Sequence, residues 1–222
     1  MFGRDWYEIL SEYLHSQSFL DIGRFITKER AKGTVYPSSE NVFRAFRETG
    51  YYETKVVLLN TEPYYNDDFK ANGLALCCGD SLSNSLAVQY ILQEIDLEYP
   101  ENVNNIDRGL DSGNFIRLAK QGVLLLNKAL TVAKNKPRSH LQQWDPFINK
   151  IVMTLDSKPN GVVFLLLGKE TQKVKDLIRN SPIVEAAHPI VHASGGEGFL
   201  GSNVFRQINE QLVALNKSEI IW

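Results

Sequence analysis

The sequence predicts an α/β fold of three layers, an α/β/α sandwich in which helices cover both faces of a central four-stranded parallel sheet. Two observations lead to this prediction: short apolar runs that read as strands, and amphipathic segments that separate these runs along the chain. Continuous apolar runs are typical of strands buried on both faces, and intervening helices form the crossovers that parallel strands need. The predicted strands span residues 56–59, 123–126, 162–167 and 183–186.

The helices are predicted from apolar residues that recur every three or four positions, as Trp6, Ile9, Leu10 and Tyr13 do in the first one. Serines precede several of these segments, where a side-chain oxygen can accept a hydrogen bond from the free N–H groups of the first turn. The predicted caps are Ser39, Ser83 or Ser85, and Ser202. The predicted helices span residues 3–28, 40–47, 83 or 85 to 97, 112–120, 144–155, 170–179 and 203–215.

Length and composition favour one globular domain that spans residues 1–222, because no stretch of the chain reads as a linker. The apolar fraction of 43% and the charged fraction of 23% are ordinary for a globular protein. The net charge of −2 gives no global sign of nucleic-acid binding. A local basic patch would be sufficient for such binding, so the total charge does not exclude it.

The chain reads as an intracellular protein. No apolar run is long enough to cross a membrane, and no secretory leader precedes Trp6. The two cysteines, Cys77 and Cys78, are adjacent and would pair only with strain, so we expect reduced thiols. We therefore expect a cytoplasmic protein, or a nuclear one in a eukaryotic host, that is not secreted.

Polar residues follow three of the predicted strands: Glu62 after the first, Asn127 after the second and His188 after the fourth. Ligands of parallel sheets bind beyond the carboxyl ends of the strands, so these side chains form a plausible catalytic set. Each also has a simpler interpretation. Asn127 could be a turn or capping residue, His188 a hydrogen-bonded turn histidine and Glu62 a solvated charge. The four histidines are too scattered to indicate a metal site.

Short motifs in a fixed order run through almost the whole chain. The most distinctive are Pro63-Tyr64, Ser139-His140, His188-Pro189 and the run Gln121-Gly122-Val123-Leu124-Leu125-Leu126-Asn127. Further matching segments are residues 35–37, 42–46, 55–58, 73–75, 130–132, 162–166, 198–201 and 221–222. In these motifs the chain resembles the family 1 uracil-DNA glycosylases. The resemblance implies their fold and the cleavage of the glycosidic bond of a uracil that is flipped out of DNA.

The resemblance also implies roles for individual residues. Glu62 would support the cationic sugar of the transition state and orient the attacking water, and His188 would donate to the uracil O2 as negative charge develops there. Asn127 would read the edge of the base, and Tyr64 would exclude the methyl group of thymine. Thr61 and Leu76 complete the implied substrate pocket.

Contacts with DNA are implied for residues in four loops. The implied DNA-binding residues are Pro37, Ser38, Ser85, Ser139 and His192, of which His192 stands where the family has a leucine wedge. The expected partner is single- or double-stranded DNA that contains uracil, and an inhibitor protein that mimics DNA is a further partner that the resemblance allows. We expect a monomer that uses no metal and no cofactor.

Several positions depart from the family pattern. The family motif Gly-Gln-Asp-Pro-Tyr-His is here Asn60-Thr61-Glu62-Pro63-Tyr64-Tyr65, so the catalytic carboxylate is longer by one methylene. Leu76 replaces the phenylalanine that stacks on the base. Two alternatives therefore stay open beside uracil excision: a glycosylase retuned to another, modified pyrimidine, and a catalytically weakened module that binds DNA or protein.

Overall fold

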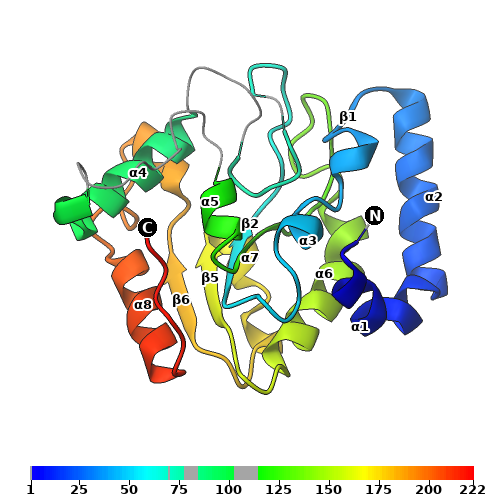
Figure 1. Ribbon diagram of the computed structural model, residues 1–222. Coiled ribbons are helices and arrows are strands. Elements are labelled where there is room, and N and C mark those ends of the chain that lie inside the picture. Colours follow the sequence, from blue (N-terminus) through cyan, green and yellow to red (C-terminus); the bar gives the residue numbers. More distant parts are fainter. Residues whose placement is uncertain (1, 70, 78–84, 103–114) are drawn as a thin grey trace.

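A parallel four-stranded sheet forms the centre of the molecule (Figure 1). The computed structural model describes residues 2–69, 71–77, 85–102 and 115–222. The central strands are β2 (Val56–Asn60), β3 (Val123–Asn127), β5 (Val163–Leu167) and β6 (Ile183–Ala186), in the spatial order β3-β2-β5-β6. All neighbouring pairs are parallel. The predicted sheet is therefore confirmed, with each strand within a residue or so of its predicted bounds.

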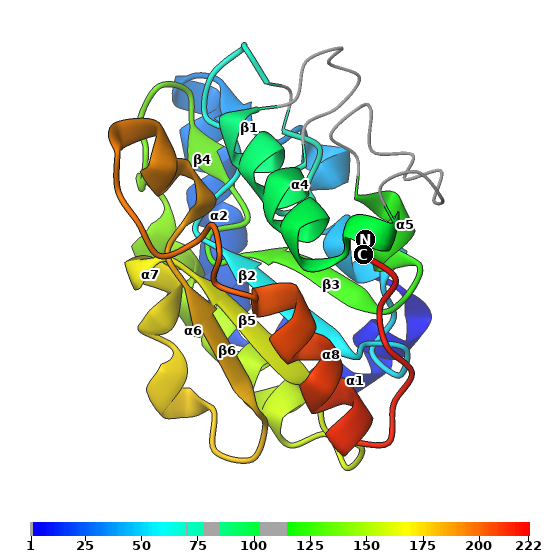
Figure 2. The same cartoon turned by 90° about the vertical axis from the view of Figure 1, so that its left-hand side faces the viewer.

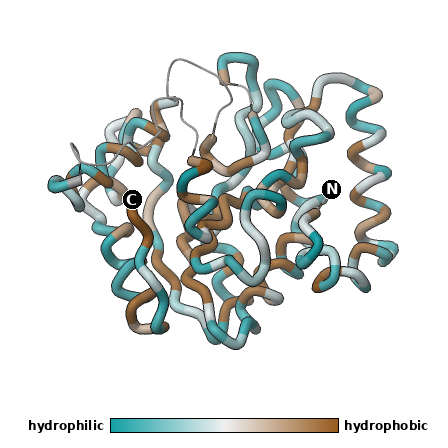
Figure 3. Tube along the Cα trace, in the orientation of Figure 1, coloured by the Kyte–Doolittle hydropathy of each residue, from teal (hydrophilic) through white to brown (hydrophobic). Residues whose placement is uncertain are grey.

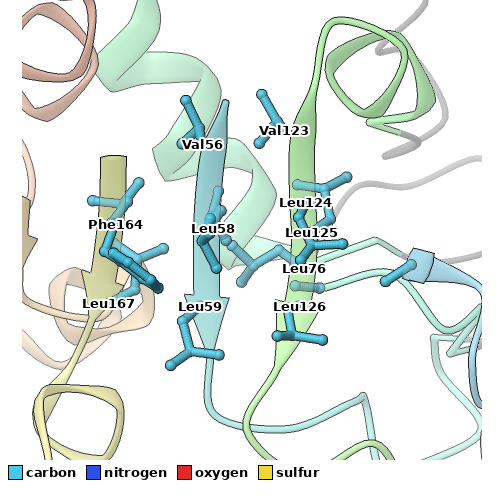
Figure 4. Close-up of a cluster of buried hydrophobic side chains, with 14 of the residues drawn as sticks. Val56, Leu58, Leu59, Leu76, Val123, Leu124, Leu125, Leu126, Phe164 and Leu167 are labelled. Carbon is cyan, nitrogen blue, oxygen red and sulfur yellow. The ribbon is translucent and has the colours of Figure 1, made fainter. Parts of the chain in front are cut away.

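The core of the protein lies on both faces of this sheet. Every residue of β2, β3 and β5 is buried, which explains why these segments are apolar without alternation. Figure 3 shows hydrophobic residues concentrated along the central strands. In Figure 4, side chains of β2 lie between those of β3 and β5, and Leu76 joins them from the loop after β2.

Helices cover the two faces (Figure 2). On one face lie α4 (Leu86–Glu98) and α8 (Val204–Ala214), and on the other lie α6 (Leu141–Asp156), α1 (Arg4–Leu14) and α2 (Gln17–Lys32). The short helices are α3 (Ala45–Glu48), α5 (Ile116–Ala119) and α7 (Lys169–Gln172), with 3-10 turns η1 (Ser39–Asn41), η2 (Pro100–Asn102), η3 (Lys175–Leu177) and η4 (Pro189–Ser194). This arrangement is the predicted α/β/α sandwich.

Three of the predicted helices are divided in the structure. The segment 3–28 forms α1 and α2, because Ser16 interrupts it and caps α2 by accepting a hydrogen bond from the backbone nitrogen of Phe19 at 3.3 Å. The segment 40–47 forms η1 and α3, and the segment 170–179 forms α7 and η3. The division changes the helices and leaves the layers as predicted.

Three further expectations were wrong. Ser39 does not cap a helix, because it is the first residue of η1, and neither η1 nor α3 has a side-chain hydrogen bond at its cap. No strand is predicted in the segment 32–39, but it contains β1 (Val35–Tyr36), which pairs antiparallel with β4 (Val132–Ala133). Ser202 does not cap α8, because the Glu98 carboxylate accepts from the backbone nitrogens of Phe205 and Arg206 in its first turn. The cap Ser85 is confirmed, while the alternative Ser83 and residues 112–114 of a predicted helix lie outside the described residues.

No helix within the described ranges combines the length and the apolar character that crossing a bilayer would need.

Candidate active site

The carboxyl ends of the parallel strands carry the residues that the sequence singles out. Asn127 is the last residue of β3, Glu62 lies two residues beyond β2, and His188 lies two residues beyond β6. Asn60, the last residue of β2, pairs in register with Asn127 and joins the group. The parallel order of the strands brings all four residues to one edge of the sheet.

Asn60 connects two of the predicted site residues. Its Nδ2 donates to Oδ1 of Asn127 at 2.9 Å, and its Oδ1 lies 2.9 Å from Nε2 of His188. Nδ2 also donates to the carbonyl oxygen of Glu62 at 3.0 Å. The structure therefore brings Asn127 and His188 together, with a carboxamide between them that the sequence prediction did not include among the site residues.

The hydrogen bonds of His188 fix its protonation. Its Nδ1 accepts from the backbone nitrogen of Ile190 at 3.2 Å, so in the neutral ring the proton is on Nε2, which donates to Asn60. Burial lowers the pKa of His188 to about 4, so the ring is neutral at pH 7. Gly168 lets the backbone after β5 pass close to His188, because a Cβ at position 168 would lie 3.0 Å from the Cβ of His188.

The Glu62 carboxylate is held by the loop that follows β4. Its Oε2 accepts from the backbone nitrogen of Arg138 at 2.7 Å. Burial raises the pKa of Glu62, and the hydrogen bond and positive charge of Arg138 offset part of that rise. Among the described residues Oε1 has no hydrogen-bond partner, so one carboxylate oxygen is available for a ligand.

Tyr64 is fixed by contacts at both ends of its side chain. Its hydroxyl donates to the carbonyl oxygen of Leu76 at 3.1 Å and also hydrogen-bonds the hydroxyl of Ser85. Its ring packs on Phe69 with the ring centroids 5.1 Å apart. Leu76 is 5% exposed and has a φ of 62°, an uncommon conformation for a residue with a bulky side chain. The position that should stack on a base therefore lies in the core next to β3 (Figure 4).

Thr61 extends the pairing of β2 and β3 beyond the ends of the strands. Its carbonyl oxygen accepts from the backbone nitrogen of Ala129 at 2.9 Å, next to the bond from the nitrogen of Lys128 to the carbonyl of Asn60 at 2.7 Å. These bonds fix the turn that leads from the sheet to Glu62.

The predicted DNA-binding residues lie in loops, and most use their polar groups within the protein. The Pro37 carbonyl accepts from Arg30 at 2.7 Å, Ser38 donates to Glu40 at 2.6 Å, and Ser139 accepts from the backbone of Ala133 at 3.0 Å. Ser85 caps α4. These contacts fix the loops, and the DNA-binding role of the residues stays a prediction.

His192 is turned back onto the protein. Its Nε2 accepts from the backbone nitrogen of Leu200 at 2.9 Å, and its ring centroid lies 5.5 Å from that of Tyr90. Ile190, two residues earlier in η4, is 42% exposed. The large apolar side chain that η4 presents to solvent is thus Ile190, which the sequence prediction did not identify as a wedge.

Asn60 was missed because it reads as the polar end of a strand, and only its pairing with Asn127 shows where its side chain lies. Within the described ranges, no three His, Cys, Asp or Glu side chains are grouped so that they could hold a metal ion.

Several known proteins are similar to the chain over nearly its whole length. No family model matches it. A uracil-DNA glycosylase of Coxiella burnetii is 35% identical over 221 residues, covering 98% of this chain and 93% of the relative. That of Lysinibacillus sphaericus is 33% identical over 229 residues, covering 100% and 97% of the two chains.

Solved structures show the same fold. The crystal structure of mimivirus uracil-DNA glycosylase superimposes with a TM-score of 0.85 at 17% identity, covering 100% of this chain and 87% of that chain. A point variant of mimivirus UNG, solved in complex with UGI, gives a TM-score of 0.87 at 18% identity, covering 100% and 89%. Together with the identity to the bacterial relatives, this shows that the chain belongs to the uracil-DNA glycosylase family.

Proposed function

We propose that this protein is a DNA-repair hydrolase that removes uracil from DNA by hydrolysing its N-glycosidic bond and leaves an abasic site. The observation that carries the proposal is the grouping of Glu62, Asn127 and a neutral His188 at the carboxyl edge of the sheet. Membership of the family supports it, because the curated relatives named above are uracil-DNA glycosylases.

The reaction separates charge, and the site residues fit both halves of it. As the bond between N1 and C1′ breaks, the sugar becomes cationic and uracil leaves as an anion. The Glu62 carboxylate stabilises the cation and takes the proton of the water that attacks C1′. The Nε2–H of His188 donates to the developing charge on O2, and because the ring is neutral it donates without giving up its proton.

Recognition of the base is assigned to Asn127 and Tyr64. The carboxamide of Asn127 offers Oδ1 as an acceptor and Nδ2 as a donor, which match the N3–H and O4 of uracil and not the donor-bearing N4 of cytosine. Tyr64 forms a wall that is fixed by Leu76 and Ser85, so it excludes a methyl group at C5 by its position. Thr61 and the buried Leu76 contribute the backbone around this pocket.

The DNA backbone is proposed to lie over the loops at this edge. Besides Pro37, Ser38, Ser85, Ser139 and His192, the exposed side chains of Lys136, Arg138 and Lys169 supply positive charge there. Such a local patch binds phosphates although the net charge is −2. The protein is proposed to act as an intracellular monomer on single- or double-stranded DNA. A UGI-like inhibitor is a candidate partner, because UGI binds a mimivirus UNG of the same fold.

The named relatives favour uracil over the two alternatives, a retuned glycosylase and a weakened binding module. The test is incubation with single- and double-stranded oligonucleotides that carry uracil, thymine or a modified pyrimidine, followed by scoring of abasic sites. We expect cleavage at uracil, at least 100-fold slower in Glu62→Gln and His188→Ala, within the range for positioned acid–base groups.

Glu12→Gln, on the exposed face of α1, is the matched control and should leave the rate unchanged. DNA binding without cleavage of any oligonucleotide would exclude the enzymatic function.

A further inference from the structure

The side chain of Asn60 is hydrogen-bonded to Asn127 and His188, the two side chains that are proposed to bind the base. The inference drawn from this contact rests on the function proposed above. Asn60 is 4% exposed, and both ends of its carboxamide are hydrogen-bonded. The motif of the family has glycine at this position, so this chain places a side chain where the family has none.

The direction of each hydrogen bond is determined. Nε2 of His188 carries the proton, because its Nδ1 accepts from Ile190, so the atom of Asn60 that faces it is the acceptor Oδ1. The other end of the carboxamide is then the donor Nδ2, which faces Oδ1 of Asn127 at 2.9 Å and the carbonyl of Glu62 at 3.0 Å. Asn60 thus accepts from His188 and donates to Asn127.

Uracil presents the same pair of groups on a single carbon atom. Its O2 is an acceptor bonded to C2, and its N3–H is a donor bonded to the same carbon, just as Oδ1 and Nδ2 share Cγ in Asn60. The protein atoms proposed to bind O2 and N3–H are Nε2 of His188 and Oδ1 of Asn127, the two atoms that Asn60 contacts.

We propose that Asn60 is an internal substitute for the O2 and N3–H edge of uracil, which holds Asn127 and His188 in their binding orientation and is displaced when a base enters. The single proton on Nε2 of His188 makes the two occupants exclusive, because it cannot be donated fully to Asn60 and to O2 at once. Asn60 therefore lowers the affinity of the site for uracil while it keeps the site aligned.

The substitute is incomplete, which explains how a base displaces it. Asn60 has no counterpart of O4, and Nδ2 of Asn127 has no hydrogen-bond partner among the described residues. Uracil uses this donor in addition to the two groups that Asn60 occupies. A base that lacks an acceptor at this position, such as cytosine, gains nothing over Asn60, so the exchange also favours uracil.

The test is the dissociation constant of free uracil, measured by titration calorimetry, for the wild-type chain, Asn60→Gly, Asn60→Ala and Asn60→Leu. We expect Asn60→Gly and Asn60→Ala to bind uracil about tenfold more tightly, a change of about 1.4 kcal/mol. Asn60→Leu fills the same space with neither donor nor acceptor and should bind more weakly than Asn60→Gly. Thermal unfolding of each variant establishes that it is folded.

Two results would overturn the inference: no tightening in either small variant, or an equal gain in Asn60→Leu. The rate of excision is recorded separately, because Asn60 also holds the carbonyl of Glu62 and its loss affects kcat. A wild-type chain that excises no uracil, with a gain of affinity in Asn60→Gly, would refute the proposed function and support the substitute. Excision by the wild-type chain without that gain would refute the substitute alone.

Discussion

The carboxylate of Glu62 accepts a hydrogen bond of 2.7 Å from the backbone nitrogen of Arg138, which lies 76 residues further along the chain. This bond sets the position of the longer acidic side chain that replaces the aspartate of the family motif. The position of the carboxylate is therefore set by the loop from β4 to α6 as well as by the length of the side chain. The chemistry proposed for the site depends on that contact.

Shortening Glu62 tests this dependence. In Glu62→Asp the oxygens withdraw by about 1.5 Å, roughly the length of one carbon–carbon bond, and the bond to Arg138 is lost. A displacement of about 1 Å costs on the order of 100-fold in rate, so we expect kcat to fall by about that factor with little change in DNA binding. Single-turnover excision rates measure it. Full activity in Glu62→Asp would show that the contact with Arg138 does not position the carboxylate.

The dependence of the rate on pH distinguishes Glu62 from His188. Burial raises the pKa of Glu62 above its ordinary value of 4.5. In the proposed reaction, only the ionised carboxylate is active. The rate should therefore rise with pH through a single limb above pH 4.5. Since the pKa of His188 is lowered to about 4, no second limb should occur near pH 6.5. A limb near 6.5 that persists in Glu62→Asp would assign the titration to His188 instead.

Ile190 and His192 are the two candidates for a side chain that enters the base stack of DNA. Ile190 is 42% exposed, whereas His192 accepts a hydrogen bond from the backbone nitrogen of Leu200 and its ring packs on Tyr90. We expect Ile190→Ala to reduce excision from double-stranded DNA about tenfold more than from single-stranded DNA, because only the duplex has to be unstacked at a cost of a few kcal/mol. The ratio of the two rates is the measurement.

Val213→Ala, on α8 and 57% exposed, is the matched control for the loss of an exposed apolar group. If His192→Ala changes the ratio and Ile190→Ala does not, the wedge predicted from the sequence is correct.

The stability of the fold should depend on the ionisation of Glu98. Burial, with a further contribution from Glu94, raises the pKa of Glu98 from 4.5 to about 7, against the opposing hydrogen bonds from α8. A raised pKa means that the folded state binds the proton more tightly. The stabilisation of the folded state by this bound proton is complete below about pH 4.5 and is lost as the pH rises through about 7.

We expect the melting temperature of the wild-type chain to fall between pH 5 and pH 8, and to fall less in Glu98→Gln, which does not titrate. Calorimetric scans of the two proteins provide the difference, with Glu210→Gln, on the exposed face of α8, as the control. Parallel slopes for wild type and Glu98→Gln would show that Glu98 does not ionise in this range.

The sheet was predictable because burial on both faces requires the apolar runs that form β2, β3 and β5. The pair β1 and β4 was not, because strands of two residues carry no periodicity. The division between α1 and α2 was missed as well, since Ser16 interrupts a pattern that remains apolar on one face.

The site was predictable in part for a similar reason. The ends of parallel strands meet at one edge, so Glu62, Asn127 and His188 could be placed there from their positions in the chain. The role of Asn60 depends on its register with Asn127, and the orientation of His192 depends on Tyr90 and Leu200. Contacts of this kind between distant segments leave no local pattern in a sequence.

The hydroxyl of Ser85 takes part in two contacts, one at the start of α4 and one with the side chain of Tyr64. It caps α4 by accepting from the backbone nitrogen of Val88 at 3.3 Å, and it hydrogen-bonds the hydroxyl of Tyr64. A substitution of Ser85 would therefore loosen the start of α4 and release the side chain of Tyr64 together. Under the proposed function, thermostability and discrimination against thymine both depend on this one oxygen atom, so selection acting on either trait constrains the other.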